Sequence, residues 1–379
     1  MRLPAPSAIV VGAGPAGSVA ALLLARAGWR VDLVEQHRFP RDKVCGECLS
    51  ALGIEVLTRL GLDGTVRAFG TIPLRFTALH AASGESVRLP LPREMWGISR
   101  HVLDQVLLLE AARAGATVHQ PARCEGFETV DGRPVVRLRD LVTNHVAEHA
   151  PDWVVVADGK STLFAPSPAP TRDFGLKAHF KDVDGPGDAI ELFGALGTYG
   201  GLAPIEANRW NAAFSVPADL LRAHAGDLEM VFERLVGENK VLRRRLREAT
   251  RVCPFLASPL PRFAVRADWP AGVVPVGNAA AALEPIGGEG MGLALRSAEL
   301  AAEHLIRAEQ RGVGLDQPGL VQAYLKLWRT RRLACRAAAR VVSSGRFAGL
   351  AMEVLRHDDR PGRLALRLMG KAPVAGVFA

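Results

Sequence analysis

Several residue types and patterns are scarce in this sequence of 379 residues, and each scarcity excludes a class of protein. Five cysteines, an odd number, do not make a disulfide scaffold, so the chain fits a reducing compartment. No run of residues reaches the roughly 18 consecutive apolar positions of a membrane-spanning helix, and the opening MRLPAPSA lacks the apolar segment of a secretory signal. We therefore expect a cytoplasmic globular protein, and we expect no nucleic-acid partner.

A glycine-rich turn dominates the start of the chain. Residues 8–11 form an apolar run typical of a buried strand, and Gly12-Ala13-Gly14-Pro15-Ala16-Gly17 follows directly. Residues 19–27 predict a helix, and residues 31–34 predict a second strand that ends at Glu35. The order of strand, turn, helix, strand and acid is the fingerprint of a fold that binds a dinucleotide.

Each glycine of that turn has a physical task. Gly12 permits the tight turn, Gly14 lets the backbone approach a pyrophosphate, and Gly17 lets the helix pack close to the strand. The unpaired N–H groups at the start of the helix then face the anion. Glu35 lies at the position expected for the acid that binds a ribose hydroxyl group, which favours FAD or NAD over NADP.

Two later segments favour a flavin over a nicotinamide. Residues 153–157 predict a strand that ends in Asp158-Gly159, and residues 273–276 predict another that runs into Gly277-Asn278. A glycine-rich loop follows at residues 284–292, before a long helix over residues 293–308. Such a loop presents N–H groups and the positive end of a helix dipole, which suits the negative side of a reduced flavin ring.

These three junctions, in this order, resemble the FAD-dependent oxidoreductase superfamily of para-hydroxybenzoate hydroxylase-type monooxygenases, flavin-dependent halogenases and geranylgeranyl reductases. Residues 40–47, Pro-Arg-Asp-Lys-Val-Cys-Gly-Glu, are similar to the Arg-x-Lys-x-Cys-Gly stretch of the geranylgeranyl reductase branch. Residues 98–104 are similar to the helix start whose arginine reaches FAD. The usual aspartate after the glycine of the last strand is Asn278 here, and its amide can still hydrogen-bond a hydroxyl group.

The resemblance implies a set of residues that hold FAD. Glu35 would bind the adenosine ribose, Arg100 and Asn278 the ribityl and pyrophosphate region, and residues 288–291 the isoalloxazine ring. The expected FAD contacts are Gly12, Gly14, Pro15, Ala16, Gly17, Glu35, Gln36, Arg41, Cys45, Gly46, Arg100, Asp158, Gly277, Asn278, Pro285, Gly287, Gly288, Gly290 and Met291. No catalytic acid or base can be assigned from the sequence.

The superfamily interleaves its domains along the chain, and the strand-like runs at residues 175–180 and 210–216 agree with that organisation. We expect an α/β protein with a Rossmann-like FAD-binding lobe, an antiparallel-sheet substrate lobe and C-terminal helices. The expected FAD-binding lobe comprises residues 1–75, 96–170 and 262–316. The expected substrate lobe comprises residues 76–95 and 171–261, and the helical region comprises residues 317–379.

The resemblance leaves the reaction open. We expect an FAD-dependent monooxygenase, of the kind used in secondary metabolism, that oxidises or hydroxylates a small apolar metabolite through a C4a-hydroperoxide of the flavin. The alternatives are reduction of isoprenoid C=C bonds, which the segment from Arg41 to Gly46 suggests, and flavin binding without turnover. Because the chain has no second dinucleotide fingerprint, electrons would come from transiently bound NAD(P)H or from a separate reductase.

Two chemistries of the superfamily lack their residues here. The chain has only Tyr199 and Tyr324, so the tyrosine relay that ionises a phenol in some hydroxylases is not evident. Halogenases carry a Trp-x-Trp-x-Ile-Pro motif and a catalytic lysine, whereas Trp96-Gly97-Ile98 lacks the second tryptophan and no lysine lies near it in the sequence. We therefore expect neither a tyrosine-assisted phenol site nor halogenation.

Two cysteines and two histidines are further candidates. Cys45 and Cys48 could form a redox dithiol that exchanges electrons with the flavin. In the alternative, Cys45 follows the family pattern and Cys48 begins a helix as a small apolar residue. His101 and His179 could titrate near neutral pH, although a lone histidine is more often a hydrogen-bonded structural residue. We expect no metal site, because no second Cys-x-x-Cys or paired histidine lies at ligand spacing.

Positive charge is concentrated at the end of the chain. Residues 329–379 hold eleven Lys and Arg against three Asp and Glu, which equals the whole formal net charge of +8. Residues 324–336 have apolar positions at helical spacing with arginines between them. This helix could bind a membrane surface, which would make the protein peripheral, or an acidic carrier protein. The alternative is a solvated helix face packed beside the FAD-binding lobe.

Overall fold

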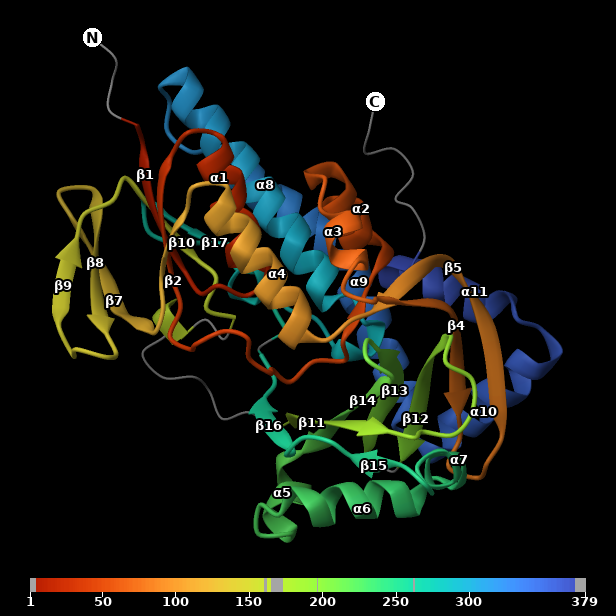
Figure 1. The fold of residues 1–379 in the computed structure, drawn as a ribbon. Coiled ribbons are helices and arrows are strands. Elements are labelled where there is room, and N and C mark those ends of the chain that lie inside the picture. Colours follow the sequence, from red (N-terminus) through yellow and green to blue (C-terminus); the bar gives the residue numbers. More distant parts are fainter. Residues whose placement is uncertain (1–4, 160–161, 165–172, 196, 262, 372–379) are drawn as a thin grey trace.

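The chain forms two lobes and a layer of C-terminal helices that runs along both of them (Figure 1). The computed structural model describes residues 5–159, 162–164, 173–195, 197–261 and 263–371. Segments of each lobe alternate along the sequence, because β4 and β5 of the second lobe come before most strands of the first.

The first lobe is built on a five-stranded parallel sheet in the order β17-β10-β1-β2-β6. Its strands are β1 (Ser7–Val11), β2 (Arg30–Val34), β6 (Thr117–His119), β10 (Trp153–Val156) and β17 (Val273–Pro275). Three helices cover one face, namely α1 (Pro15–Arg26), α4 (Arg100–Arg113) and α8 (Gly290–Arg311). A three-stranded meander covers the other, namely β7 (Ala122–Val130), β8 (Arg133–Asp140) and β9 (Val146–His149).

The alternation of side chains along β1 explains these layers. Ala8 and Val10 belong to the buried cluster that includes the three helices, whereas Ile9 and Val11 belong to the cluster under the meander. Both faces of the strand are therefore buried, as a continuous apolar run predicts for a parallel sheet.

The second lobe is built on a nine-stranded mixed sheet in the order β15-β11-β14-β13-β12-β4-β5-β3, with β16 paired to β11. Neighbouring strands run antiparallel, except for β4 and β12, which run parallel. The strands are β3 (Cys48–Leu49), β4 (Ile72–His80), β5 (Ser86–Gly97), β11 (Asp173–Lys181), β12 (Ala189–Ala195), β13 (Thr198–Ile205), β14 (Arg209–Pro217), β15 (Thr250–Arg251) and β16 (Leu256–Pro259).

Short helices cover the far side of this mixed sheet (Figure 1). They are α5 (Ala218–Ala223), α6 (Leu228–Glu238) and α7 (Lys240–Arg245). Phe180 of β11, Phe214 of β14 and Phe232 of α6 pack their rings together between the sheet and the helices. The face of the sheet toward the first lobe is therefore left to line the site.

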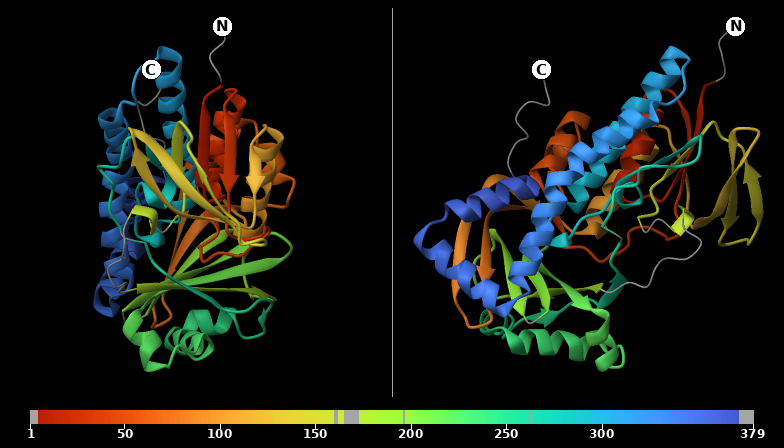
Figure 2. Two further views of the ribbon diagram at one scale, coloured as in Figure 1. Left: turned by 90° about the vertical axis from the view of Figure 1, so that its left-hand side faces the viewer. Right: turned by 180° about the vertical axis from the view of Figure 1, so that it is seen from behind.

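The C-terminal layer consists of α9 (Gln317–Val342), α10 (Gly345–His357), α11 (Arg360–Leu366) and a last turn over Arg367–Lys371 (Figure 2). The first of these helices contacts α8 and β12, and the other two contact β5, so the layer joins the two lobes. The remaining helices, α2 (Ala51–Leu60) and α3 (Asp63–Arg67), pack beside α8 and α4. No helix within the described residues is both long enough and apolar enough to cross a bilayer.

The structure confirms the expected fold class, a Rossmann-like lobe interleaved with a lobe built on a second sheet and followed by helices. One local prediction was wrong: Cys48 and Leu49 do not begin a helix but form β3, which pairs with Gly97 and Trp96. Helix α2 begins only after Ser50. The sequence analysis also missed the meander, because its strands carry many exposed polar residues and lack a clean apolar alternation.

Candidate functional site

The turn between β1 and α1 has the geometry that its glycines predict. Gly12 has a φ of +98°, and a Cβ there would lie 2.6 Å from the carbonyl oxygen of Ala157. A Cβ at Gly17 would lie 1.7 Å from the carbonyl oxygen of Gly12. A Cβ at Gly14 would meet Arg100 Nη2 at 3.5 Å, an ordinary contact, because this residue faces a hollow. The turn is thus closed toward the protein and open toward the hollow, which we name the nucleotide pocket.

The start of α1 and the end of β2 flank this pocket. Helix α1 begins at Pro15 after an extended Gly14, and no described side chain caps its first N–H groups, so they are available to an anion. Glu35 is 5% exposed, and its carboxylate accepts the N–H groups of Ala13 at 3.0 Å and His37 at 2.9 Å. The carboxylate is fixed next to the turn and keeps lone pairs for a ribose hydroxyl group.

Three cations gather beside the open side of the turn. Arg100 lines the pocket and donates to both carboxylate oxygens of Asp104 at 2.6 Å. Arg41 lies 3.4 Å from Asp104 and 3.9 Å from Glu35, and its buried Nε has no hydrogen-bond partner among the described residues. Burial, with the neighbouring Arg100 and Arg41, lowers the pKa of Lys43 to about 8. This cluster suits a pyrophosphate.

A second helix start faces the same pocket. Gly277 has a φ of +60°, and a Cβ there would lie 2.9 Å from Ala16 Cβ, so the end of β17 packs closely on α1. Gly288, Gly290 and Met291 line the pocket where α8 begins. The positive ends of two helix dipoles, those of α1 and α8, therefore point into one hollow.

Most of the predicted FAD contacts lie at this pocket. Those that line it are Gly14, Pro15, Ala16, Cys45, Gly46, Arg100, Gly277, Asn278, Pro285, Gly288, Gly290 and Met291. Those outside its lining are Gly12, Gly17, Glu35, Gln36, Arg41, Asp158 and Gly287. Gly12 and Gly17 serve the turn itself. Asp158 accepts the N–H group of Leu163 at 3.3 Å, Gln36 is exposed, and Gly287 lines the neighbouring hollow.

A second hollow, which we name the apolar pocket, joins the nucleotide pocket on the side of the mixed sheet. Its walls come from β4, β5, β11 to β14 and the last described residues of the chain. The side chains in the lining are mostly hydrocarbon, including Leu91, Ile190, Leu192, Leu260, Ile286, Leu366 and Met369. Residues shared by the two pockets are Val44, Cys45, Gly46, Cys48, Leu260, Pro285 and Gly288. The loop at residues 44–48 and Gly288 thus form the boundary between the pockets.

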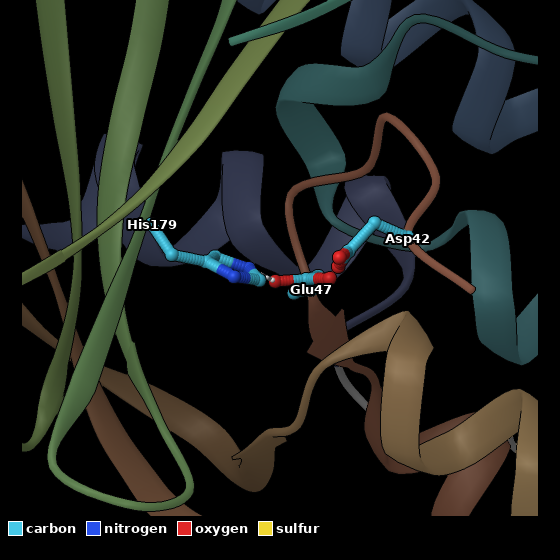
Figure 3. Close-up of side chains that lie close together, drawn as sticks. All are labelled: Asp42, Glu47 and His179. Atoms are coloured by element: carbon cyan, nitrogen blue, oxygen red, sulfur yellow. Dashed lines mark hydrogen bonds and ion pairs between the residues drawn. The ribbon is translucent and has the colours of Figure 1, made fainter. Parts of the chain in front are cut away.

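Buried polar groups fix this boundary loop to the mixed sheet. Glu47 is fully buried, and its carboxylate accepts a hydrogen bond from His179 Nε2 at 2.6 Å (Figure 3). It accepts another from Lys177 Nζ at 2.5 Å. It also accepts the N–H group of Arg100 at 2.8 Å, and Asn211 Nδ2 donates to the carbonyl oxygen of Cys45 at 3.0 Å. Burial raises the pKa of Glu47, but the Lys177 charge and the hydrogen bond from His179 outweigh burial and lower it. The loop is therefore held by a charged anchor.

The same cluster has the spacing of a metal site but the charges of an ion pair. Asp42, Glu47 and His179 bring ligand atoms within 4.8 Å of one another. Lys177 Nζ, however, lies 2.5 Å from Glu47 Oε1 and 3.5 Å from Asp42 Oδ1. Because this ammonium group already takes the place of a cation between the carboxylates, we assign the cluster to loop anchoring. His179 is thus a hydrogen-bonded residue, and His101 lies 3.9 Å from Asp42 at the surface.

Three further residues of the pockets, Lys43, Lys371 and Tyr199, were not predicted as site residues from the sequence. Lys43 belongs to the quoted Arg-x-Lys-x-Cys-Gly stretch, and this motif could have assigned it to the pocket. Lys371, from the end of the described chain, lines the apolar pocket and lies 3.3 Å from the buried Glu289. Tyr199 also lines the apolar pocket, where its hydroxyl group donates to Glu284 and burial raises its pKa. These long-range contacts leave no local pattern in the sequence.

Both cysteines of the boundary loop are free thiols. Cys48 lines both pockets, and its Sγ donates to the carbonyl oxygen of Gly46 at 3.3 Å. Burial raises the pKa of the Cys48 thiol to about 12, so it keeps its proton at neutral pH. A protonated thiol is a poor nucleophile for disulfide exchange, which weakens the dithiol interpretation.

The nucleotide pocket fits FAD on three observations. The cradle at Gly14 would be filled by any larger side chain, the buried Arg41 Nε needs an acceptor, and Glu35 is fixed where the ribose of a dinucleotide would lie. Residues 6–172 also match the family described as "FAD binding domain".

Comparisons with curated proteins give relatives of several activities. The chain is 28% identical to the menaquinone reductase of Mycolicibacterium smegmatis over 96% of this chain and 90% of that protein. It is 27% identical to the kynurenine 3-monooxygenase of Salinispora arenicola over 81% of this chain and 74% of that protein. It is 26% identical to digeranylgeranylglycerophospholipid reductase 2 of Methanopyrus kandleri over 85% of this chain and 81% of that protein.

Solved structures show the same fold. The flavoprotein/dehydrogenase from Cytophaga hutchinsonii aligns with a TM-score of 0.79 at 20% identity, covering 96% of this chain and 92% of that chain. The flavin-dependent brominase Bmp2 aligns with a TM-score of 0.78 at 19% identity, covering 96% of this chain and 93% of that chain. Together with the glycine turn, the second helix junction and the family match, these findings show that the chain fits the FAD-dependent oxidoreductase superfamily.

Proposed function

We propose that this protein is an FAD-dependent reductase that saturates a carbon–carbon double bond in an apolar, isoprenoid-type substrate. The observation that carries the proposal is the apolar pocket, which opens on the nucleotide pocket at the boundary loop and Gly288. Among its described lining residues, Lys371 is the one charged side chain, and it is paired with Glu289. Such a pocket suits a hydrocarbon chain and gives a charged substrate no partner.

FAD, when bound and reduced, would supply a hydride. The residues of the chain would position the cofactor: the start of α1 with Arg100 and Lys43 would bind the pyrophosphate, and Glu35 would bind the ribose. The N–H groups at Gly288 and Gly290 would hold the ring end where the two pockets meet. The strands of the mixed sheet and the C-terminal helices cover the substrate and exclude water.

Saturation of a double bond also needs a proton, and Cys48 is placed to hold it. Cys48 lines both pockets, so it borders the space in which the substrate and the flavin ring would meet. Because burial raises the pKa of this thiol to about 12, Sγ carries a proton throughout the neutral range. We propose that Cys48 Sγ delivers the proton to the carbon that does not receive the hydride.

The names of two relatives support the reductase proposal. Two of the three curated relatives described above, which cover 96% and 85% of this chain, are named as reductases of a menaquinone and of a digeranylgeranyl lipid. The Arg41-Asp42-Lys43-Val44-Cys45-Gly46 stretch resembles the same branch of the superfamily. In this structure that stretch reaches the boundary between the pockets, where the reaction would occur.

Monooxygenation of a small apolar metabolite is the second candidate. It is favoured by the similarity to kynurenine 3-monooxygenase over 81% of this chain. A water-excluding apolar pocket also serves an oxygenation, because it protects a reactive oxygen species from decay. NAD(P)H bound transiently, or a separate reductase, would supply electrons in either case.

One experiment separates the two reactions. The purified, FAD-loaded protein is reduced with dithionite and mixed without oxygen with polyprenyl alcohols of increasing length. We expect a product that gains two hydrogen atoms, with the flavin reoxidised in step. A product that forms only with oxygen and gains one oxygen atom would instead establish the monooxygenase.

A variant that fills the pocket completes the test. Ala203→Phe places a ring in the buried lining of the apolar pocket and should abolish turnover while leaving FAD content unchanged. The matched control is Ala337→Phe on the exposed side of α9, which should keep full activity. Equal activities of the two variants would rule out this pocket as the substrate site.

A further inference from the structure

The outer side of α10 exposes large apolar side chains. Phe347 is 61% exposed, Leu350 64% and Val354 44%. Their spacing of three and four residues places them on one side of the helix. The other side of α10 packs on the protein, because Ala348 and Met352 of the same helix are buried. The exposed row is therefore not needed for packing within the described part of the chain.

The neighbouring segment continues this surface. Helix α11 and the last turn contact each other, and α11 contacts α10. Leu364 is 57% exposed and Leu368 is 44% exposed, four residues apart. We call the five residues Phe347, Leu350, Val354, Leu364 and Leu368 the apolar face. Exposed apolar residues gathered on adjacent helices, rather than scattered singly, mark an interaction surface.

Cations border the apolar face. Arg346, Arg356 and Arg367 are exposed beside its members in the sequence, and no ion pair is found for them within the described part of the chain. On α9, which leads into α10, residues 317–342 contain no Asp or Glu. Its exposed cations Arg329, Arg336 and Arg340 are spaced by seven and four residues, so they share one side of the helix. The layer thus combines apolar side chains with arginines that form no ion pair among the described residues, although Arg356 and Arg336 act over a longer distance on Glu85 and Glu284.

The inner side of the same segment lines the apolar pocket. Leu366 and Met369 are buried and belong to the pocket lining, whereas Leu364 and Leu368 point outward. Residues 364–369 are therefore one wall with the pocket on one side and the apolar face on the other. An apolar compound that approached this face would be separated from the pocket by a single helical turn.

We propose that the apolar face and its arginines dock this protein on a membrane that carries anionic phospholipids. Amphipathic helices that lie in the interface insert leucine and phenylalanine side chains and present arginines to lipid phosphates. The excess of positive charge matches an anionic surface. Docking here places the wall of the apolar pocket against the bilayer, where apolar substrates are concentrated. The inference rests on the surface itself and does not depend on which reaction the site catalyses.

The test is co-sedimentation of the full, FAD-loaded chain with vesicles. One set contains phosphatidylcholine alone, and the other contains phosphatidylcholine and phosphatidylglycerol in equal amounts. We expect binding to the anionic vesicles at least about tenfold stronger than to the neutral ones, because arginines near the surface are attracted to anionic lipid headgroups. Added salt should weaken that binding. Absence of binding to the anionic vesicles would overturn the proposal.

Paired variants locate the contact. The double variant Phe347→Ser, Leu350→Ser should lower binding to anionic vesicles at least about tenfold, because two inserted side chains are lost. The control Val142→Ser, Val313→Ser removes side chains that are 63% and 58% exposed elsewhere on the molecule and should bind as the wild type does. Since all four side chains are exposed, circular dichroism should show the same fold in both variants.

Sedimentation velocity tests the competing occupant, a second copy of this chain. We expect the same sedimentation coefficient for the wild type and for Phe347→Ser, Leu350→Ser without vesicles. If the wild type is a dimer that this double variant converts to a monomer, the apolar face is an interface between copies and the membrane proposal is wrong. If both double variants bind vesicles equally, the proposed face is likewise excluded.

Discussion

The two pockets of this protein are built in different ways. The nucleotide pocket takes its anion-binding groups largely from backbone: glycines at the β1–α1 turn and at the start of α8, together with two helix N-termini. The apolar pocket takes its hydrocarbon side chains from strands of the mixed sheet, the neighbouring loops and the end of the described chain. A backbone pocket depends on which residues are glycine, whereas a side-chain pocket depends on how distant segments pack.

Because of this difference, enzymes with different reactions can share the same kind of nucleotide pocket, whereas their substrate pockets differ. The backbone of the nucleotide pocket recognises groups common to every FAD molecule. In the proposed function the apolar pocket determines the substrate, and its wall could change residue by residue without disturbing the cofactor. The boundary loop at residues 44–48 belongs to both pockets, so the anchor under Glu47 supports both functions.

We expect the largest loss of stability from a substitution in the glycine turn of the nucleotide pocket. Gly17→Ala would place a Cβ 1.7 Å from the carbonyl oxygen of Gly12, and neither backbone can move without opening the sheet. We expect a loss of more than about 4 kcal/mol in the free energy of unfolding, measured by urea denaturation. The control Gly237→Ala adds a Cβ to an exposed helical glycine in α6 and should not destabilise the protein. A stable Gly17→Ala protein would contradict the close packing described here.

A smaller loss of stability should follow from removing the charge of Glu47, which anchors the boundary loop. Glu47→Gln leaves the buried Lys177 ammonium group without its carboxylate, so we expect a loss of about 3 kcal/mol in the free energy of unfolding. Adding Lys177→Met to this variant should recover part of the loss, because the unpaired charge is removed. Glu248→Gln, at an exposed position, serves as the control. No difference between Glu47→Gln and its control would show that the pair is not a structural anchor.

A third prediction concerns the proton at the boundary. If Cys48 Sγ delivers a proton, Cys48→Ala should lower turnover about a hundredfold while FAD content and substrate affinity stay unchanged. The matched control is Cys124→Ala, which alters another buried thiol, in the meander and away from both pockets. Steady-state kinetics and the flavin absorbance measure these quantities. Equal turnover in the two variants would remove Cys48 from the reaction.

The smallest expected effect is a pH dependence of cofactor binding. The pKa of Lys43 is lowered to about 8, so its positive charge is present below that pH and is lost as the pH rises through it. The pyrophosphate of FAD is anionic throughout, and its affinity should therefore fall about fivefold between roughly pH 7 and 9. Titration of FAD into the apoprotein, followed by flavin fluorescence, gives the dissociation constant. In Lys43→Met the dissociation constant should be higher at neutral pH and should not change over this range.

The contrast between the pockets also determines which site residues could be predicted from the sequence. Gly12, Gly14, Gly17 and Glu35 lie within one short segment, so their spacing alone predicted the turn that the structure shows. The junction at residues 277–291 was predictable for the same reason. Each is a local pattern of backbone requirements that the sequence displays directly.

The residues of the apolar pocket could not be predicted in this way. Lys371 contacts Glu289 and the carbonyl oxygen of Gly287, which is 84 residues away in the sequence, and Lys177 contacts Glu47, which is 130 residues away. Nothing in the local sequence around Lys177 or Lys371 indicates a buried cation. The pairing of Cys48 with Gly97 in β3 likewise depends on a partner far along the chain. Such contacts are fixed by tertiary packing, which local propensity does not contain.

A crystal structure of the FAD complex would show whether the cofactor and the apolar pocket meet. We expect the adenosine ribose beside Glu35, the pyrophosphate at the starts of α1 and α4, and the flavin ring at the boundary formed by Cys48 and Gly288. One face of the ring should border the apolar pocket. A flavin ring that lies away from this boundary, or that is separated from the apolar pocket by the loop at residues 44–48, would rule out the proposed reaction site.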